Sequence, residues 1–104
     1  MDRKSQLLAF LQESPDDPFL NYALATEHVS EGNDEAAAVI FEKLITEQPS
    51  YVATYYHLGK LMERRGEKQA AMDIYRKGME QAKLAGERHS LSELQSALLE
   101  LEYD

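Results

Sequence analysis

The chain has 104 residues, the length of one ordinary domain, and 43% of them are hydrophobic, which is enough to form a core. Its 11 basic and 19 acidic residues give a formal net charge of −8, which argues against nucleic acid or an anionic membrane as a partner. The absence of cysteine excludes thiol chemistry, and no apolar run is long enough for a signal peptide or a membrane span of ~20 residues, so we expect a cytoplasmic protein.

A short helix is predicted over residues 3–13, because its apolar residues follow helical spacing. The two prolines of the segment 14–18 end this helix, since proline disfavours helix at the preceding residue and lacks an N–H. The apolar positions are Leu7, Leu8, Phe10 and Leu11.

The second predicted helix runs from Pro18 to about residue 31. Asp17 can cap its N-terminus, and Pro18 suits the first turn. Gly32 can adopt the positive φ that closes a helix. The apolar positions are Phe19, Tyr22, Ala23, Leu24, Ala25, His28 and Val29.

The third predicted helix runs from about residue 35 to residue 48, with Asn33 or Asp34 as its N-cap. Its small Ala36 and Ala37 allow its backbone to approach the preceding helix. Its larger apolar positions are Ile40, Phe41, Leu44 and Ile45.

The fourth helix is predicted from about residue 51 to residue 65, with Ser50 as its N-cap. Gly59 lies inside it and costs ~1 kcal/mol relative to alanine, so we expect a neighbouring side chain to pack closely over this glycine. Gly66 then turns the chain into a fifth helix that runs from residue 67 to about residue 84.

Gly86 breaks the fifth helix, and the last helix is predicted from about residue 89 to residue 102. Ser90 and Glu93 fit a capping box at its start. Its glutamine and glutamate side indicates a solvated terminal cap. Its apolar side consists of Leu91, Leu94, Ala97, Leu98 and Leu101.

One pattern occurs twice between residues 18 and 85, because Pro18–Tyr51 aligns with Val52–Ala85 without a gap. Every matching pair is 34 residues apart, a period that is typical of stacked helical repeats. The first helix follows the same period, since Leu7 lies 34 residues before Phe41. The pairs are Leu24 with Leu58, Ala25 with Gly59, Gly32 with Gly66, Ala37 with Ala71, Ile40 with Ile74, and Phe41 with Tyr75.

With these residues the chain resembles the tetratricopeptide repeat family. The second repeat carries the family signature at Tyr55, Leu58, Gly59, Ala71 and Tyr75, and the first repeat carries it at Leu24, Ala25, Ala37, Phe41 and Pro49. Asn21 in place of an aromatic residue and Lys83 in place of the closing proline depart from the signature. The resemblance implies an all-α, right-handed stack of antiparallel helix pairs in a single domain. The implied domain divides into a half-repeat (1–17), two full repeats (18–51 and 52–85) and a capping helix (86–104).

In this family the first helix of each pair lines a concave groove that binds a partner's peptide or helix. Tyr22 and Tyr56 are 34 residues apart and lie off the packing side of Leu24 and Leu58, so both are candidate anchors together with Phe19, and we expect Tyr56 to be the most exposed. The alternative is that these aromatic residues pack against a neighbouring helix or the cap. The resemblance implies a groove lined by Phe19, Tyr22, Thr26, Val29, Ala53, Tyr56, Lys60, Glu63 and Arg64.

No residue pattern for catalysis is present, and we expect no catalytic residue, no cofactor and no metal ligand. His28, His57 and His89 are too widely separated in the sequence to suggest a shared metal site, which favours structural roles. The sequence therefore predicts an adaptor that binds an unidentified protein, and neither nucleic acid nor a membrane. The alternative is a structural unit that forms a homodimer through the groove or the capping helix.

Overall fold

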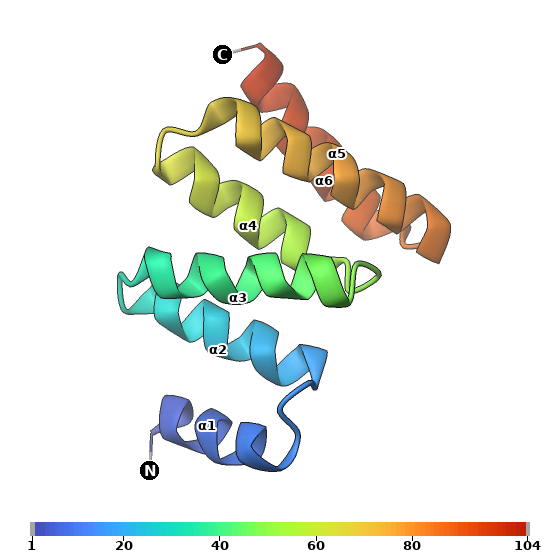
Figure 1. Ribbon diagram of the computed structural model, residues 1–104. Coiled ribbons are helices and arrows are strands. Elements are labelled where there is room, and N and C mark those ends of the chain that lie inside the picture. The colour runs from blue at the N-terminus through green and yellow to red at the C-terminus, as the bar shows by residue number, and fades with distance from the viewer. Residues whose placement is uncertain (1, 104) are drawn as a thin grey trace. The chain divides into compact units, whose positions relative to one another are not determined.

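The computed structural model describes residues 2–103, and all the regular secondary structure in this range is helical. The all-α prediction is confirmed (Figure 1). The helices are α1 (Arg3–Glu13), α2 (Pro18–Ser30), α3 (Asp34–Glu47), α4 (Ala53–Arg64), α5 (Lys68–Ala85) and α6 (Arg88–Glu102). They form two compact units, of which the first ends at Gln48 and the second begins at Pro49.

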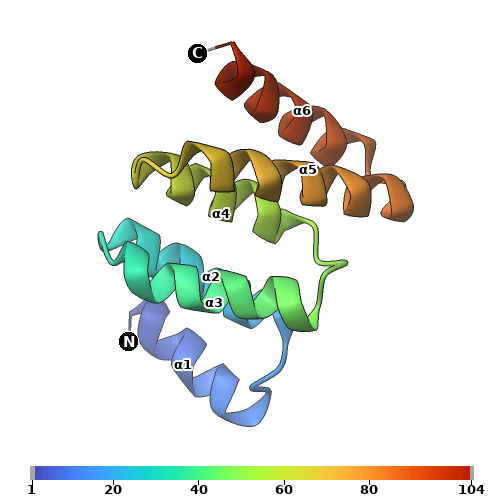
Figure 2. The ribbon, with the colours of Figure 1, turned by 45° about the horizontal axis from the view of Figure 1, so that its top comes forward.

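The first unit contains α1, α2 and α3. A tight turn at Gly32, which has a φ of 79°, reverses the chain, so that α2 and α3 lie side by side (Figures 1 and 2). The expected close approach of the two backbones is met at Ala37, which is fully buried, whereas Ala36 is only half-buried. The buried apolar residues of this unit are Leu7, Ala23, Leu24, Ala25, Ala37, Ala38, Phe41 and Leu44.

Helix α1 packs on α2 with one buried side chain, Leu7. The broad apolar face predicted for α1 is buried only in part, since Leu8 and Phe10 are 46% and 58% exposed. Ion pairs add to this packing: Arg3 Nε lies 2.7 Å from Glu27 Oε1. Exposed ion pairs of this kind contribute about 0–1 kcal/mol, so α1 depends mainly on Leu7.

In the second unit, α4 and α5 form a pair, and α6 lies beside α5 and also contacts α4 (Figure 2). Gly59 of α4 lies directly under the ring of Tyr75 on α5, and a Cβ atom at Gly59 would overlap that ring. In the same way, a Cβ atom at Gly78 of α5 would lie 2.5 Å from Tyr55 Cβ on α4. The expectation that a neighbouring side chain packs over Gly59 is therefore confirmed.

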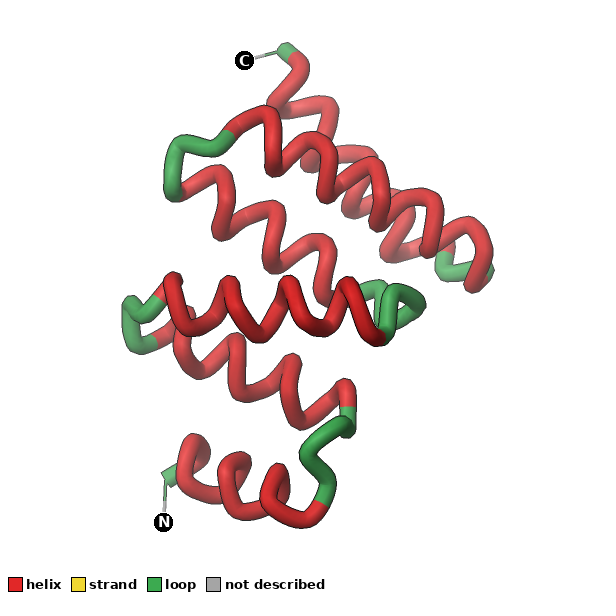
Figure 3. The backbone as a smooth tube through the Cα atoms, viewed as in Figure 1, coloured by secondary structure: helices red, strands yellow, loops and turns green. Residues whose placement is uncertain are grey.

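Short loops join the helices (Figure 3), and two of the predicted N-caps are confirmed. The Asp17 carboxylate accepts a hydrogen bond from the Leu20 N–H at 3.0 Å. At α3 the cap is Asn33 rather than Asp34, because the Asn33 side chain accepts from the Ala36 N–H at 3.3 Å.

The other two predicted caps are wrong. Ser50 lies in a turn before α4, which begins at Ala53 and has no side-chain cap. Backbone hydrogen bonds close this turn, including one from the Thr54 N–H to the Tyr51 carbonyl. Ser90 lies inside α6, which begins at Arg88, because the chain returns to helix two residues after the left-handed Gly86.

None of the helices within residues 2–103 is long and apolar enough to cross a membrane.

Candidate functional site

In the first unit, the candidate binding residues lie at steps of three and four residues along α2: Phe19, Tyr22, Thr26 and Val29. Phe19 is 56% exposed, and the other three are half-buried. The Tyr22 ring packs against the Phe41 ring of α3, with the ring centroids 6.4 Å apart. The Thr26 hydroxyl donates to the Ala23 carbonyl at 2.8 Å, so this hydroxyl is used within its own helix.

In the second unit, Tyr56 of α4 is half-buried because its ring is surrounded. The ring centroids of His57 and Tyr75 lie 5.8 Å and 6.4 Å away, and Lys60 Nζ lies 5.5 Å from the Tyr56 centroid. The expectation that Tyr56 is the most exposed of the aromatic anchors is wrong, since Phe19 is more exposed. These neighbours cover part of the Tyr56 ring and limit its exposure.

Glu63 lies one helical turn after Lys60 on α4 and contacts both Lys60 and Tyr75. The fully buried Tyr75 donates its hydroxyl hydrogen to the Glu63 carboxylate, and Lys60 Nζ lies 3.6 Å from the same Glu63 oxygen. Burial raises the pKa of the Tyr75 hydroxyl, and the hydrogen bond to Glu63 raises it further, so this tyrosine stays protonated. Glu63 therefore positions Tyr75 and Lys60 and offsets the lysine charge.

A cavity of about 220 Å³ lies between α4 and α6. Its lining residues are Tyr56 and Lys60 from α4, and His89, Ser92, Glu93, Ser96, Ala97 and Glu100 from α6. The other α4 candidates, Ala53, Glu63 and Arg64, are not among the residues that line it. The structure therefore brings two of the predicted residues together with six from the helix that is expected to serve only as a cap.

A sequence signal for the α6 residues exists at a different offset. The apolar positions Tyr55, Leu58 and Met62 match Leu91, Leu94 and Leu98, each 36 residues later. At this offset Tyr56 and Lys60 align with Ser92 and Ser96. The fifth helix extends to Ala85 and ends at Gly86, so the third occurrence of the pattern is displaced by two residues from the 34-residue period. The polar side of α6 that we expected to be a solvated cap forms one wall of this cavity.

The cavity lining combines polar and apolar surface and carries both signs of charge. Glu93 and Glu100 face one lysine, Lys60, and the exposed imidazole of His89 lies 3.5 Å from Glu93. Burial lowers the pKa of His57, the neighbour of Tyr56, although the Glu93 carboxylate acts in the opposite direction. The lining therefore offers carboxylates, hydroxyls and one aromatic face. Among residues 2–103 there is no group of three or more metal-ligating side chains.

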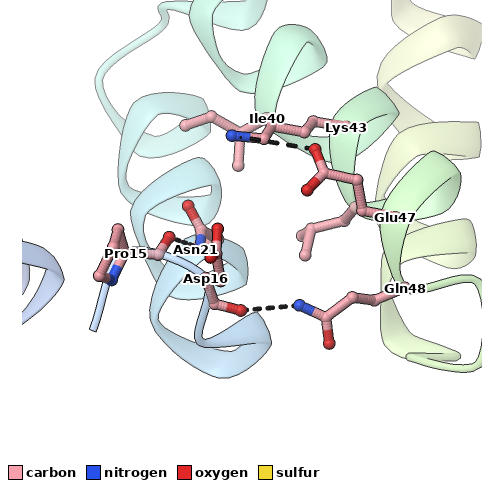
Figure 4. A pocket seen from close by; sticks show the side chains of 8 residues that line it. Pro15, Asp16, Asn21, Ile40, Lys43, Glu47 and Gln48 are labelled. Atoms are coloured by element: carbon pink, nitrogen blue, oxygen red, sulfur yellow. Dashed lines mark hydrogen bonds and ion pairs between the residues drawn. The ribbon is translucent and has the colours of Figure 1, made fainter.

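A second hollow, in the first unit, measures only about 20 Å³, which is the space of about one water molecule (Figure 4). Its polar groups bond to one another: Gln48 Nε2 donates to the Asp16 carbonyl at 2.7 Å, and Asn21 Nδ2 donates to the Pro15 carbonyl at 2.9 Å. These bonds hold the α1–α2 loop against α2 and the end of α3, which is a structural role.

No protein-family model and no curated protein sequence matches the chain significantly. Among solved structures, it is similar to a tetratricopeptide repeat domain protein from Salinibacter ruber. The crystal structure of that protein is 49% identical, with a TM-score of 0.80, over 83% of this chain and 97% of that chain. Its solution structure is 49% identical, with a TM-score of 0.82, over 85% of this chain and 89% of that chain.

A Bordetella parapertussis protein solved in solution has the same fold, with a TM-score of 0.84 at 22% identity, over 99% of this chain and 90% of that chain. The Salinibacter relative is similar in sequence along nearly its whole chain as well as in fold. The signature residues of the two repeats also lie where the fold uses them, as the packing of Tyr75 over Gly59 illustrates. This chain therefore belongs to the tetratricopeptide repeat family.

Proposed function

We propose that this protein is a non-enzymatic interaction module that binds a segment of a partner protein against α4 and α6. The observation that carries this proposal is the cavity between these helices. Its volume of about 220 Å³ is below the range of about 300–1,000 Å³ in which small ligands are usually bound. A cavity of this size suits one side chain of a partner, with the rest of that segment lying along the two helices.

Tyr56 is the proposed anchor of this surface. Aromatic residues contribute strongly to protein interfaces, and a side chain that is already ordered loses less entropy on binding. The neighbouring rings and Lys60 order the Tyr56 side chain before any partner arrives. Membership of a repeat family that serves protein–protein interaction supports the same conclusion.

The proposal is tested by affinity purification from the native host with the Tyr56→Ala variant as bait. Tyr103→Ala is the matched control, because Tyr103 is 87% exposed and lies outside the cavity. We expect the proteins that co-purify with the wild type to be lost with Tyr56→Ala and retained with Tyr103→Ala, while circular dichroism shows the same helicity for all three. An unchanged set with Tyr56→Ala would exclude α4 as the binding surface.

A second candidate function is self-association through the outer side of α5 and α6. Met79, Leu98 and Leu99 line a shallow hollow of about 340 Å³ there, and Leu99 is 50% exposed. Light scattering at several concentrations tests this alternative. A dimer that Leu99→Lys abolishes would support it, provided that Leu84→Lys, at an 82% exposed residue of α5 outside the hollow, leaves the dimer intact. A monomer at all concentrations would exclude it.

A further inference from the structure

We propose that the cavity between α4 and α6 accepts a lysine or arginine side chain, so that the partner segment is basic at that position. This inference rests on the proposed function, because it specifies the chemistry of a segment that binds there.

The charges that line the cavity are unequal. Glu93 and Glu100 contribute two carboxylates from α6, whereas Lys60 is the single lysine of the lining, and the imidazole of His89 lies 3.5 Å from Glu93. The Lys60 ammonium lies 3.6 Å from the carboxylate of Glu63, a residue outside the lining. Glu63 therefore offsets the positive charge of Lys60. With histidine counted as neutral, as at pH 7, the uncompensated charge at the cavity wall is negative, and it favours a cation.

The charges of both carboxylates also influence titratable side chains on α4 and α5. The Glu93 charge opposes the lowering of the His57 pKa on α4, and the Glu100 charge is one of the smaller causes that raise the Tyr75 pKa on α5. The two glutamates lie seven residues, or roughly 10 Å, apart along α6. A cation that enters between them can be approached by either carboxylate.

The rest of the lining suits the stem of a long basic side chain. Lysine and arginine bury their methylene groups against apolar surface while the charged end stays in polar surroundings. Ala97 and the ring of Tyr56 supply apolar surface, and Ser92 and Ser96 supply hydroxyl groups that can accept hydrogen bonds from an ammonium or guanidinium.

An acidic or phosphorylated segment fits the same cavity poorly. Its charge would approach Glu93 and Glu100, and the basic side chains of the lining already have carboxylate neighbours, since Lys60 lies beside Glu63 and His89 lies beside Glu93. Like charges brought together at an interface repel each other, which suppresses binding of the wrong partner. The formal net charge of −8 on the whole chain also favours the approach of a basic segment.

Selection of random 12-residue peptides displayed on phage, with the full chain immobilised, tests the inference without a known partner. The wild type is compared with Tyr56→Ala, with the double variant Glu93→Lys/Glu100→Lys, and with Glu80→Lys. Glu80 is an exposed glutamate of α5 outside the cavity, so its reversal controls for a general change of charge.

We expect the wild type to enrich peptides that share one lysine or arginine at a fixed position, and Tyr56→Ala to lose them. A synthetic peptide from that set should bind about tenfold more weakly to Glu93→Gln/Glu100→Gln, as measured by calorimetry. The double lysine variant should prefer the same peptide with glutamate at the fixed position. Glu80→Lys should behave as the wild type, and circular dichroism of each variant confirms that its helices are retained.

Two failures can be told apart. Peptides that depend on Tyr56 but share no basic residue would overturn this inference and leave the proposed function standing. If no peptide binds in a way that depends on Tyr56, the proposed function fails, and this inference fails with it.

Discussion

At Gly59 the backbone of α4 lies against the ring of Tyr75, and there is no room for a methyl group. Alanine at this position would gain ~1 kcal/mol of helix propensity but would overpack a fully buried ring, which typically costs 1–3 kcal/mol. Because Tyr75 is also held by Glu63 and cannot move aside freely, overpacking should dominate. We predict that Gly59→Ala lowers the free energy of unfolding by about 1–2 kcal/mol.

Urea denaturation measures this change. Glu80→Ala serves as the control, since substitution of an exposed helical residue should stay within about 0.5 kcal/mol of the wild type. A Gly59→Ala variant more stable than the wild type would show that the Tyr75 ring yields, and would contradict the packing described above.

His57 makes stability depend on pH. Burial lowers its pKa below 6.5, so the neutral imidazole is favoured in the folded state. The unfolded chain then binds more protons in the range below about 6.5, and the free energy of unfolding falls as the pH drops through that range. The stabilisation that comes from the neutral His57 imidazole is fully present above about pH 6.5.

We therefore predict that His57→Gln reduces the loss of stability between about pH 7.5 and pH 5.5. Urea denaturation at the two pH values gives the change in the free energy of unfolding with pH for each protein. A loss of stability that is the same at both pH values does not alter this slope. An equal slope in wild type and variant would mean that His57 does not titrate differently on folding.

The starts of α2 and α4 allow a matched comparison, because α2 has a side-chain cap and α4 has none. The Asp17 carboxylate accepts a hydrogen bond from the Leu20 N–H, whereas Ser50 makes no cap at α4. We predict that Asp17→Ala lowers the free energy of unfolding by about 1 kcal/mol. Ser50→Ala should stay within about 0.5 kcal/mol of the wild type. Equal effects in thermal or urea unfolding would show that the cap bond is not a stabilising interaction.

The helices themselves could be predicted from the sequence, because the period, the glycines and the prolines all indicate the same boundaries. Ser50 and Ser90 were misassigned for a physical reason. Serine favours the N-cap position only when its backbone already lies at the start of a helix, and here backbone bonds before α4 and the return to helix after Gly86 place the two starts elsewhere. Such local backbone bonding has no clear signal in the sequence.

The α4 side of the candidate site could be predicted from the sequence, and the α6 side could not. Tyr56 and Lys60 follow from the repeated pattern, since they lie on the side of α4 that does not carry Leu58. The α6 wall was missed because the period lengthens from 34 to 36 residues after α5, which displaces Ser92, Ser96 and Glu100 from the expected alignment. Their arrangement around a cavity depends on how α6 packs against α5 and α4, which requires the structure.

For the whole molecule, the prediction of a single domain leads to a test by unfolding. The first compact unit ends at residue 48 of a 104-residue chain, so each unit is shorter than about 60 residues, the size at which an isolated domain is marginally stable. We therefore predict one cooperative thermal transition, with the same midpoint by far-ultraviolet circular dichroism and by tyrosine fluorescence. Two separated transitions would show that the units unfold independently.

The central claim is that α4 and α6 together form a surface for a basic protein segment. The most direct measurement is titration of the isotope-labelled full chain with a lysine-containing peptide from the selection above, followed by nuclear magnetic resonance. We predict that the largest amide shift changes occur around Tyr56, Lys60, Ser92 and Ser96, and that replacing the peptide lysine with glutamate abolishes them. Shift changes confined to residues outside α4 and α6, or unaffected by that replacement, would contradict the claim.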